Sequence, residues 1–305
     1  MQIIKNTTDF ILDGSYCVAI GKFDGIHKGH QYLLKCIEEY KKDGYKIAVF
    51  TFDPSPAAFF SKEEYKGLTT IDEKRRIFEK LKVDVLVEYP LNEQTASISP
   101  EEFIEDILIK RMHVKCVVCG SDFSFGDKAK GNAELLRAYG IRRGFEVKVC
   151  EKVKYDGVEI SSSLIRQEVE AGHMENVTKH IGAYYSFTGT VVTGRQIGRK
   201  LGMPTVNIIP SDDKLLPPFG VYEAVVSYAG EHYKGITNVG VKPTVTDEHK
   251  PVVETYIFDF DEDIYGREIV VNLVSMVRPE KKFDSVDELK AQIKADINFV
   301  KNKYL

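Results

Sequence analysis

The sequence predicts two domains of different class: an α/β domain with a doubly wound parallel sheet, then a small antiparallel β-barrel with a terminal helix. The chain has 305 residues, enough for about two domains of roughly 150 residues each. Its first half alternates apolar runs with helical patterns, as in a parallel sheet covered on both faces by helices. From about residue 185 the predicted strands follow one another directly. We therefore expect domains at residues 1–184 and 185–305.

In the first domain, short apolar runs predict strands and capping residues predict helices. The strands are expected at residues 17–20, 47–52, 83–87, 114–119 and 145–149. Thr70 and Ser99 each precede a glutamate by three residues, the spacing of a capping box, so a helix should begin after each of them. A further helix is expected at residues 132–139. Ligands of such sheets bind at the carboxyl ends of the strands, so polar residues there are candidates for a site.

Two short helices, at residues 164–171 and 174–181, should lead into the second domain. Runs rich in Val, Ile, Tyr and Thr, separated by Gly and Pro, predict its strands. These runs are residues 188–192, 222–228, 232–239, 252–260 and 269–277. Ser285 opens a last capping box, which predicts a helix that runs toward Val300.

Composition and charge weigh against several classes of protein. The chain is 43% hydrophobic and 29% charged, as ordinary globular proteins are. A net charge of −4 argues against a general nucleic-acid-binding protein, which is normally basic. No apolar run reaches the roughly 18 residues of a membrane span, and the N-terminus lacks a signal-peptide pattern. We expect a cytoplasmic protein that acts on small molecules, without nucleic acid or membrane, as a monomer or weak homo-oligomer.

The cysteine pattern predicts neither disulfides nor a metal site. An odd count of five cysteines without secretion features argues against a disulfide framework. Cys116 and Cys119 have the spacing of a metal-binding pair, but they lie in an expected strand. Residues three apart on a strand face opposite sides, so these two thiolates could not share one ion.

The most informative motif covers residues 21–30, with the sequence GKFDGIHKGH, between an expected strand and a helical stretch. Residues three apart share one face of a helix, so the rings of His27 and His30 should point the same way. A helix N-terminus offers free N–H groups and a dipole that attracts anions. The motif therefore predicts a polyphosphate site. The candidates for nucleotide contacts here are Gly21, Phe23, Asp24, Gly25 and Gly29.

A second phosphate-binding group is predicted where a later helix opens. Ser161 and Ser162 begin this helix, and Arg166 follows on its first turn. Hydroxyl groups together with the fork of N–H donors of a guanidinium could hold a phosphate. A serine at this position is also a routine helix cap, so each hydroxyl taken alone has a purely structural explanation.

Residues 120–126, a glycine-flanked turn with two phenylalanines, allow two interpretations. Phe123 and Phe125 could belong to the hydrophobic core. They could instead form a pocket for a planar ring, with Asp122 near the polar edge of the ligand. The residues alone leave both interpretations open.

The second domain begins with a glycine-rich basic loop. Such a loop lets backbone amides approach a phosphate, although it lacks the Gly-Lys-Ser/Thr ending of a P-loop. An exposed hairpin with basic residues is the alternative. The candidate nucleotide contacts are Gly194, Gly198, Arg199, Lys200 and Gly202.

Three polar side chains of the second domain suit phosphoryl transfer. Thr205 and Asn207 lie two residues apart, on one face of the chain, and offer neutral oxygens to Mg²⁺ and phosphate. Glu254 lies inside an apolar strand. As a general base it could accept the proton of an alcohol that attacks phosphorus.

Over nearly its whole length, and in the right order, the chain resembles the bacterial bifunctional riboflavin kinase/FAD synthetase family. The segments that carry the resemblance in the first half are residues 21–30, 51–54, 120–126 and 160–166. Those in the second half are residues 198–207, 220–222, 238–240, 243–244, 254, 265–266, 278–280 and 283–284. Ser55 stands where the family usually has a histidine, and Ser124 where it often has a basic residue.

The resemblance implies two reactions and a role for each candidate residue. In the barrel, riboflavin and ATP would give FMN, with Glu254 as the base and Thr205 and Asn207 holding Mg²⁺ and phosphate. In the nucleotidylyltransferase-like domain, FMN and a second ATP would give FAD and pyrophosphate. The residues that would stabilise the transferring group there are His27, His30, Ser161, Ser162 and Arg166. The flavin contacts would be Asp122, Phe123, Phe125 and Arg278.

Three alternatives remain open at this point. One activity could have been lost, leaving only the kinase or only the adenylyltransferase. The chain could be a flavin-binding regulator without turnover, although that would not explain His27, His30 and Glu254 together. It could also be a nucleotidylyltransferase for another metabolite, although the barrel would then have no explanation.

Overall fold

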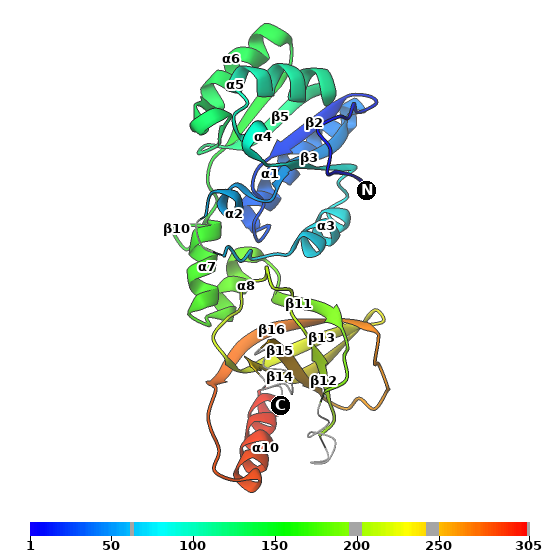
Figure 1. The fold of residues 1–305 in the computed structure, drawn as a ribbon, viewed down its shortest axis with the longest axis vertical. Coiled ribbons are helices and arrows are strands. Elements are labelled where there is room, and N and C mark those ends of the chain that lie inside the picture. Colours follow the sequence, from blue (N-terminus) through cyan, green and yellow to red (C-terminus); the bar gives the residue numbers. More distant parts are fainter. Residues whose placement is uncertain (62–63, 195–202, 242–249, 304–305) are drawn as a thin grey trace. The chain divides into compact units, whose positions relative to one another are not determined.

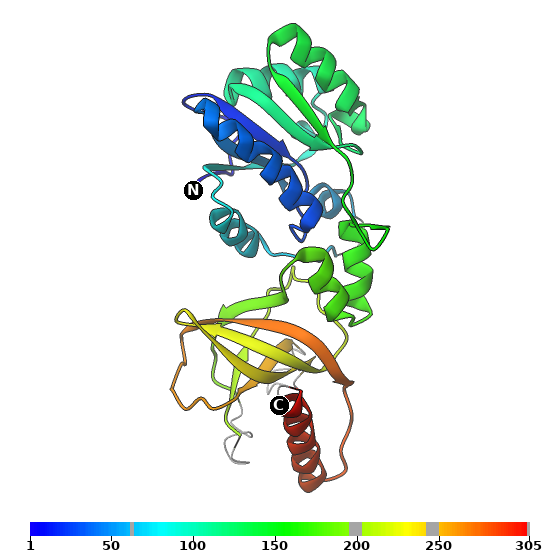
Figure 2. The ribbon, with the colours of Figure 1, turned by 180° about the vertical axis from the view of Figure 1, so that it is seen from behind.

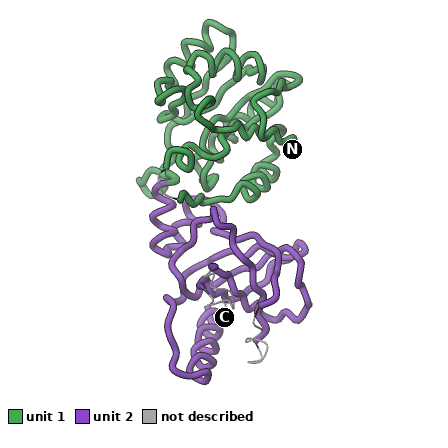
Figure 3. Tube along the Cα trace, viewed as in Figure 1, with its two compact units in different colours: residues 1–162 green, residues 163–305 purple. Residues whose placement is uncertain are grey.

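The structure, a computed structural model, describes residues 1–61, 64–194, 203–241 and 250–303. The chain divides into two compact units, Met1–Ser162 and Ser163–Leu305 (Figure 3). Each unit is described by itself below. The expected boundary between the two activities, after residue 184, stays a prediction.

A six-stranded sheet of parallel strands forms the centre of the first unit, in the order β1-β4-β3-β2-β5-β8 (Figure 1). The strands are β1 (Gln2–Lys5), β2 (Tyr16–Ile20), β3 (Lys46–Asp53), β4 (Val85–Pro90), β5 (Val114–Gly120) and β8 (Glu146–Cys150). The five strands that the sequence predicts are confirmed, and the parallel, doubly wound class with them. The strand order reverses between β2 and β5, which is the point where such sheets bind ligands.

Helices cover both faces of this sheet, which Figures 1 and 2 view from opposite sides. One face is covered by α1 (Lys28–Glu38) and α3 (Ile71–Lys80), and the other by α5 (Pro100–Glu102), the π-helix η2 (Phe103–Arg111) and α6 (Ala133–Arg143). Cys116 is buried under the first face and Cys119 under the second. The two thiols therefore point to opposite sides of β5, as the alternation of a strand requires.

The helix starts follow the local capping signals. Thr70 accepts a hydrogen bond from the Glu73 N–H at 3.2 Å, and the Glu73 carboxylate accepts one from the Thr70 N–H at 3.0 Å, so the predicted capping box is complete. Ser99 accepts from the Glu102 N–H at 3.1 Å. Asn132 caps α6 in the same way. These short-range contacts explain why the helices could be predicted from local sequence.

Short elements connect the main ones. They are η1 (Glu39–Asp43), α2 (Pro56–Phe60), α4 (Glu93–Ala96), β6 (Ser124–Phe125), η3 (Asp127–Ala129), β7 (Gly131–Asn132), β9 (Lys154–Tyr155) and β10 (Val158–Glu159). Gly131 is required by a close approach, because a Cβ there would lie 2.8 Å from the ring of Phe125. The helices α7 (Ser162–Glu170) and α8 (Met174–Ile181) then match the two predicted helices.

The second unit is built on a six-stranded antiparallel sheet, in the order β11-β16-β13-β14-β15-β12. The strands are β11 (Tyr185–Thr190), β12 (Thr205–Ile208), β13 (Gly220–Tyr228), β14 (Glu231–Val241), β15 (Pro251–Ile257) and β16 (Glu268–Pro279). The sheet curls until its edges meet where the Val192 N–H donates to the Asn207 carbonyl at 2.8 Å. The expected antiparallel barrel is thus present as a curled half-barrel, joined in its described part by one bridge beside the short strand β12.

A terminal helix, α10 (Val286–Asn302), packs on this sheet. Its Val300 side chain is buried with Val221, Ile236 and Phe258. Ser285 caps the helix by accepting a hydrogen bond from the Glu288 N–H at 3.2 Å. The helix predicted from this capping signal is confirmed.

Candidate active sites

The two histidines of the 21–30 motif lie together at the start of α1. His27 is the N-cap residue, and its Nδ1 accepts a hydrogen bond from the Gly29 N–H at 3.2 Å. The ring of His30 stacks on the ring of His27, with centroids 3.8 Å apart and planes 25° apart. A Cβ at Gly29 would lie 3.0 Å from the His27 ring, so a larger residue would crowd it. The predicted pairing of the rings, beyond the carboxyl end of β2, is confirmed.

The His30 ring is held in an environment that favours its neutral form. It lies against the buried ring of Phe23, with centroids 5.0 Å apart, and Phe23 packs in turn on Phe78. Burial lowers the pKa of His30 well below its ordinary value, and the charges of His27 and Lys74 lower it further. The His30 Nδ1 atom is buried without a hydrogen-bond partner among the described residues. An anion bound beside the ring would oppose these effects and raise the pKa of His30.

Other residues of the motif shape the turn that carries the histidines. The Asp24 carboxylate accepts hydrogen bonds from the Leu68 N–H at 2.7 Å and the Tyr65 hydroxyl at 2.8 Å. Gly25 has φ +80°, and a Cβ there would also lie 3.0 Å from Leu68 Cδ1. A Cβ at Gly21 would likewise lie 3.2 Å from the Phe23 ring. Phe23 is in the core, and the Asp24 carboxylate is hydrogen-bonded to the segment that contains Tyr65 and Leu68. The contact of either residue with a nucleotide stays a prediction.

The serine motif meets the same turn. The Ser162 hydroxyl donates to the backbone carbonyl of Asp24 at 2.9 Å, so the start of α7 is fastened to the histidine turn. Ser161 directly precedes α7. Arg166 lies on the next turn of α7, in the second unit. The phosphate-binding roles of Ser161, Ser162 and Arg166 remain predictions.

Lys74 is a candidate that the sequence analysis missed. This lysine of α3 is only 7% exposed, and its ammonium donates to the Lys22 carbonyl at a long 3.5 Å. Burial lowers its pKa, while the carboxylates of Asp24, Asp53 and Glu88 oppose that shift. A lysine in a capped amphipathic helix normally lies on the surface, so no local signal indicates that this one is buried beside the histidines.

An apolar cavity of about 350 Å³ lies at the carboxyl ends of β3 and β4. It is lined by aromatic side chains from separate elements: Phe52, Phe60, Tyr89, Phe103 and Phe125. Its size and lining suit a planar ring. Except for Phe125, these residues were not predicted, because they come from segments far apart in the sequence.

The predicted flavin contacts of the 120–126 turn are only partly at this cavity. Phe125 lines it, and the Phe123 ring stacks on Phe125 at 5.2 Å. Asp122 is exposed, does not line the cavity, and forms an ion pair with Lys152 at 3.4 Å. Phe125 is therefore both a core residue and a wall of the cavity. The contact of Asp122 with flavin stays a prediction.

The two serines that depart from the family pattern, Ser55 and Ser124, both lie at or next to the apolar cavity. Ser55 caps α2 by accepting from the Ala58 N–H at 3.2 Å, and Pro56 and Phe60 of that helix line the cavity. Ser124 lines the cavity directly. At residue 55 the serine has a structural role, which is to fix the helix that forms one wall.

In the second unit, the predicted catalytic side chains meet through strand pairing. Asn207 of β12 and Asn238 of β14 both stand opposite Glu254 of β15. The Thr205 hydroxyl donates to the Glu254 carboxylate at 2.7 Å. A Cβ at Gly194 would lie 2.5 Å from the Asn207 side-chain nitrogen, so a larger residue there would displace the Asn207 amide. The strand register thus brings Thr205, Asn207 and Glu254 together, while their roles in catalysis and metal binding stay predictions.

Other predicted residues of this unit do not join that group. Gly198, Arg199, Lys200 and Gly202 lie outside the described residues, as does the 243–244 segment. The Arg278 guanidinium donates to Asp296 of α10 at 2.9 Å and to the Pro279 carbonyl at 3.1 Å. This arginine therefore anchors the terminal helix, and its contact with flavin stays a prediction.

The donor atoms near Glu254 suit a hard cation. A threonine hydroxyl, an asparagine amide and a carboxylate are oxygen donors of the kind that Mg²⁺ takes together with substrate phosphates. Within the described residues no three His, Cys, Asp or Glu side chains cluster as a metal site. The same residues include no helix long and apolar enough to cross a membrane.

The fold and these two groups define a class of protein: a transferase with separate sites for phosphate chemistry in its two units. Residues 12–164 match the FAD synthetase family and residues 181–304 the riboflavin kinase family. The chain belongs to the bifunctional riboflavin kinase/FMN adenylyltransferase family. The resemblance recognised in the sequence is thereby confirmed.

Curated relatives and a solved structure support this membership. A bifunctional riboflavin kinase/FMN adenylyltransferase of Listeria monocytogenes is 36% identical over 95% of this chain and 93% of its own. The protein of that name from Escherichia coli is 35% identical over 92% and 90%. A crystal structure titled as a macrolide-efflux protein from Streptococcus pneumoniae has the same fold, with 34% identity and a TM-score of 0.88 over 98% of both chains.

Proposed function

We propose that the chain makes FMN from riboflavin and ATP in its second unit, and FAD with pyrophosphate from FMN and ATP in its first. The match to both families and the bifunctional names of the relatives support this assignment. The observation that carries it is that each unit has its own reactive group. These groups are the stacked His27 and His30 rings in one unit and the Thr205–Glu254 hydrogen bond in the other.

In the adenylyl transfer, a phosphate oxygen of FMN attacks the α-phosphorus of ATP. The bond from this phosphorus to the oxygen shared with the β-phosphate breaks, and pyrophosphate leaves. No covalent enzyme intermediate is needed. The N–H groups at the start of α1 and the imidazoles of His27 and His30 stabilise the charge that builds up on the transferring group. Lys74 adds a positive charge nearby, which favours binding of the triphosphate.

In the phosphoryl transfer, the terminal ribityl hydroxyl of riboflavin attacks the γ-phosphorus of ATP. Glu254 accepts the proton of that hydroxyl, and its hydrogen bond from Thr205 orients the carboxylate. Thr205 and Asn207 would hold Mg²⁺ together with the phosphates of ATP. The ion would neutralise part of the negative charge on the leaving phosphates.

We further propose that the protein works in the cytoplasm as a monomer or weak homo-oligomer. Its partners are the small molecules riboflavin, FMN and ATP, without nucleic acid. The net charge of −4 supports the last point.

One incubation tests the assignment. Purified protein, riboflavin, ATP and Mg²⁺ are mixed, and flavins are followed by chromatography over time. We expect FMN to appear first and FAD to follow. FMN alone would indicate a kinase that has lost the second activity, and FAD formed only from added FMN would indicate the reverse. A protein that binds flavin and forms neither product would be a regulator, and the proposal would be wrong.

A further inference from the structure

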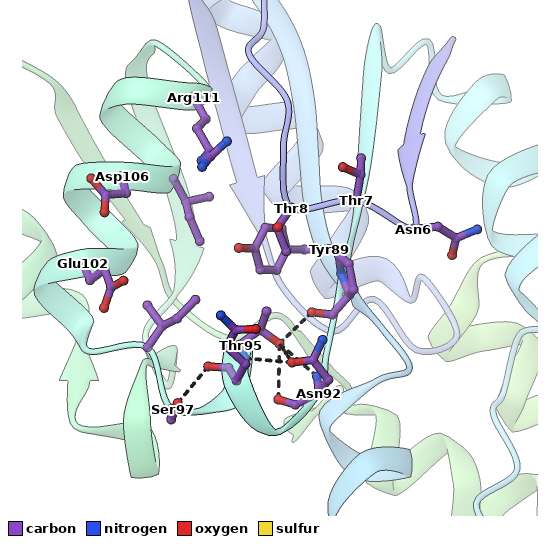
Figure 4. A pocket seen from close by; sticks show the side chains of 14 residues that line it. Asn6, Thr7, Thr8, Tyr89, Asn92, Thr95, Ser97, Glu102, Asp106 and Arg111 are labelled. Atoms are coloured by element: carbon purple, nitrogen blue, oxygen red, sulfur yellow. Dashed lines mark hydrogen bonds between the residues drawn. The ribbon is translucent and has the colours of Figure 1, made fainter.

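A second cavity of the first unit, about 710 Å³ in volume, takes no part in the proposed reactions (Figure 4). It shares Tyr89, Thr95, Ile98 and Ile107 with the apolar cavity, so the two adjoin. Most of its lining is neutral and polar, including Asn6, Thr7, Thr8, Asn92 and Gln94. A volume of this size is typical of small-molecule sites.

The charged part of the lining comes from α5 and the π-helix η2. Glu102, Asp106 and Arg111 line the cavity from this one continuous helix (Figure 4). Five residues of an α-helix turn through about 500°, which would put Arg111 about 140° away from Asp106. The i to i+5 hydrogen bonding of a π-helix brings residues five apart back to one side. π-Helical turns are rare and are often found at functional sites.

Two of the three charged residues that line the cavity pair with residues outside the lining. Asp106 pairs with Lys110 at 2.5 Å, and Arg111 with Asp9 at 3.4 Å. The Glu102 carboxylate has neither an ion pair nor a side-chain hydrogen bond in the described part of the chain. A hydroxyl that enters the cavity could donate a hydrogen bond to this exposed carboxylate.

Tyr89 links the two cavities. The residue is only 4% exposed, and its ring lines the apolar cavity. Its hydroxyl points into the polar cavity (Figure 4) and has no hydrogen-bond partner among the described residues. This hydroxyl oxygen is not fully buried, so a ligand that enters the polar cavity can reach it. Burial raises the pKa of Tyr89, so this group stays a hydroxyl and can both donate and accept.

We propose that the polar cavity binds a neutral polyhydroxyl chain. Two sources share this chemistry: a free polyol, and the ribityl chain of a riboflavin whose ring occupies the adjoining apolar cavity. The second case rests on the proposed function. Riboflavin bound in this way presents no phosphate for adenylyl transfer and excludes FMN from the apolar cavity. Unphosphorylated riboflavin would then slow FAD synthesis until it has been converted to FMN.

Three probes separate the two sources. FAD formation from FMN and ATP is measured with the full-length protein in the presence of 5′-deoxyriboflavin, which lacks the hydroxyl that accepts phosphate. Lumiflavin, the ring without the chain, and ribitol, the chain without the ring, are the other probes. If the ribityl chain is the occupant, 5′-deoxyriboflavin should compete with FMN about tenfold more tightly than lumiflavin, a gain expected from one or two hydrogen bonds. If a free polyol is the occupant, ribitol alone should bind, as measured by calorimetry.

Variants of the lining residues test whether the polar cavity is the place where the probes bind. If the ribityl chain is the occupant, Glu102→Gln and Tyr89→Phe should reduce the ratio of the affinities for 5′-deoxyriboflavin and lumiflavin by about threefold or more. If a free polyol is the occupant, the same variants should reduce the affinity for ribitol by a similar factor. Glu101→Gln is the matched control, because Glu101 is exposed on the same helix and does not line the cavity. Equal binding of the two flavins without ribitol binding would overturn the proposal, as would an unchanged advantage in Glu102→Gln. If no FAD forms even without probes, the proposed function fails instead, and calorimetry with the same probes still tests the cavity.

Discussion

The histidine site of the first unit and the glutamate site of the second are assembled in opposite ways. His27, Gly29 and His30 come from four consecutive residues, and one helix start sets their geometry. Glu254 meets Thr205 and Asn207 only because β12 pairs with β15 in one register. The first site depends on local conformation and on backbone N–H groups, the second on long-range pairing and on side-chain oxygens. A substitution that disables one site should therefore leave the other site active.

The largest effect is expected from Glu254→Gln. Loss of the general base should slow FMN formation by about 10²–10⁴-fold, while FAD formation from supplied FMN should continue. Initial rates of both steps, measured by chromatography, test this. Glu231→Gln is a suitable control, since Glu231 is exposed at the start of β14. A variant that folds and loses both activities would show that the two centres are not independent.

His27→Ala should give the reverse pattern with a somewhat smaller effect. Removing one preorganised group at the transferring phosphate should slow FAD formation by about 10²–10³-fold, and riboflavin should still be converted to FMN. The matched control is His113→Ala, because His113 directly precedes β5, at the amino ends of the strands, where its Nδ1 lies 2.7 Å from the Leu12 carbonyl. Normal FAD synthesis in His27→Ala would remove the histidine pair from the mechanism.

The smallest effect concerns pH and sharpens the comparison further. The pKa of His30 lies below the ordinary value of 6.5 in the folded protein, so the unfolded chain takes up a proton first as the pH falls. Stability is then complete above about pH 6.5 and is lost as the pH falls toward the pKa of the folded state. The melting temperature of His30→Asn should fall less steeply below pH 6.5 than that of the wild type. Parallel curves for the two proteins would contradict the assigned shift.

Much of the fold could be predicted because its signals are local. The hydroxyls of Thr70 and Ser285 mark the starts of their helices, because each accepts a hydrogen bond from the N–H three residues later. β1 was missed because its short sequence, QIIK, carries polar residues at both ends and gains its place only by pairing with β4. β12 was likewise not predicted as a strand, since four residues give too short a pattern.

The sites, like the fold, could be predicted only where local sequence sets the geometry. The spacing of His27 and His30 is enough to bring their rings together, because one helix turn decides it. The aromatic cavity needs Phe60 of α2 and Phe103 of η2 to meet, which no local pattern contains. Lys74 follows the same logic, because the Lys22 carbonyl that its ammonium approaches is far away in the sequence.

The pairing of β12 with β15 has a consequence for how sequence change acts on the second unit. Side chains alternate along a strand, so a one-residue slip of β12 would turn Thr205 and Asn207 to the other face and present Val206 instead. The backbone ladder could re-form after such a slip, yet phosphorylation would stop. Insertions or deletions near this strand should thus be tolerated only when they leave its alignment with Glu254 intact, a stricter demand than foldability alone.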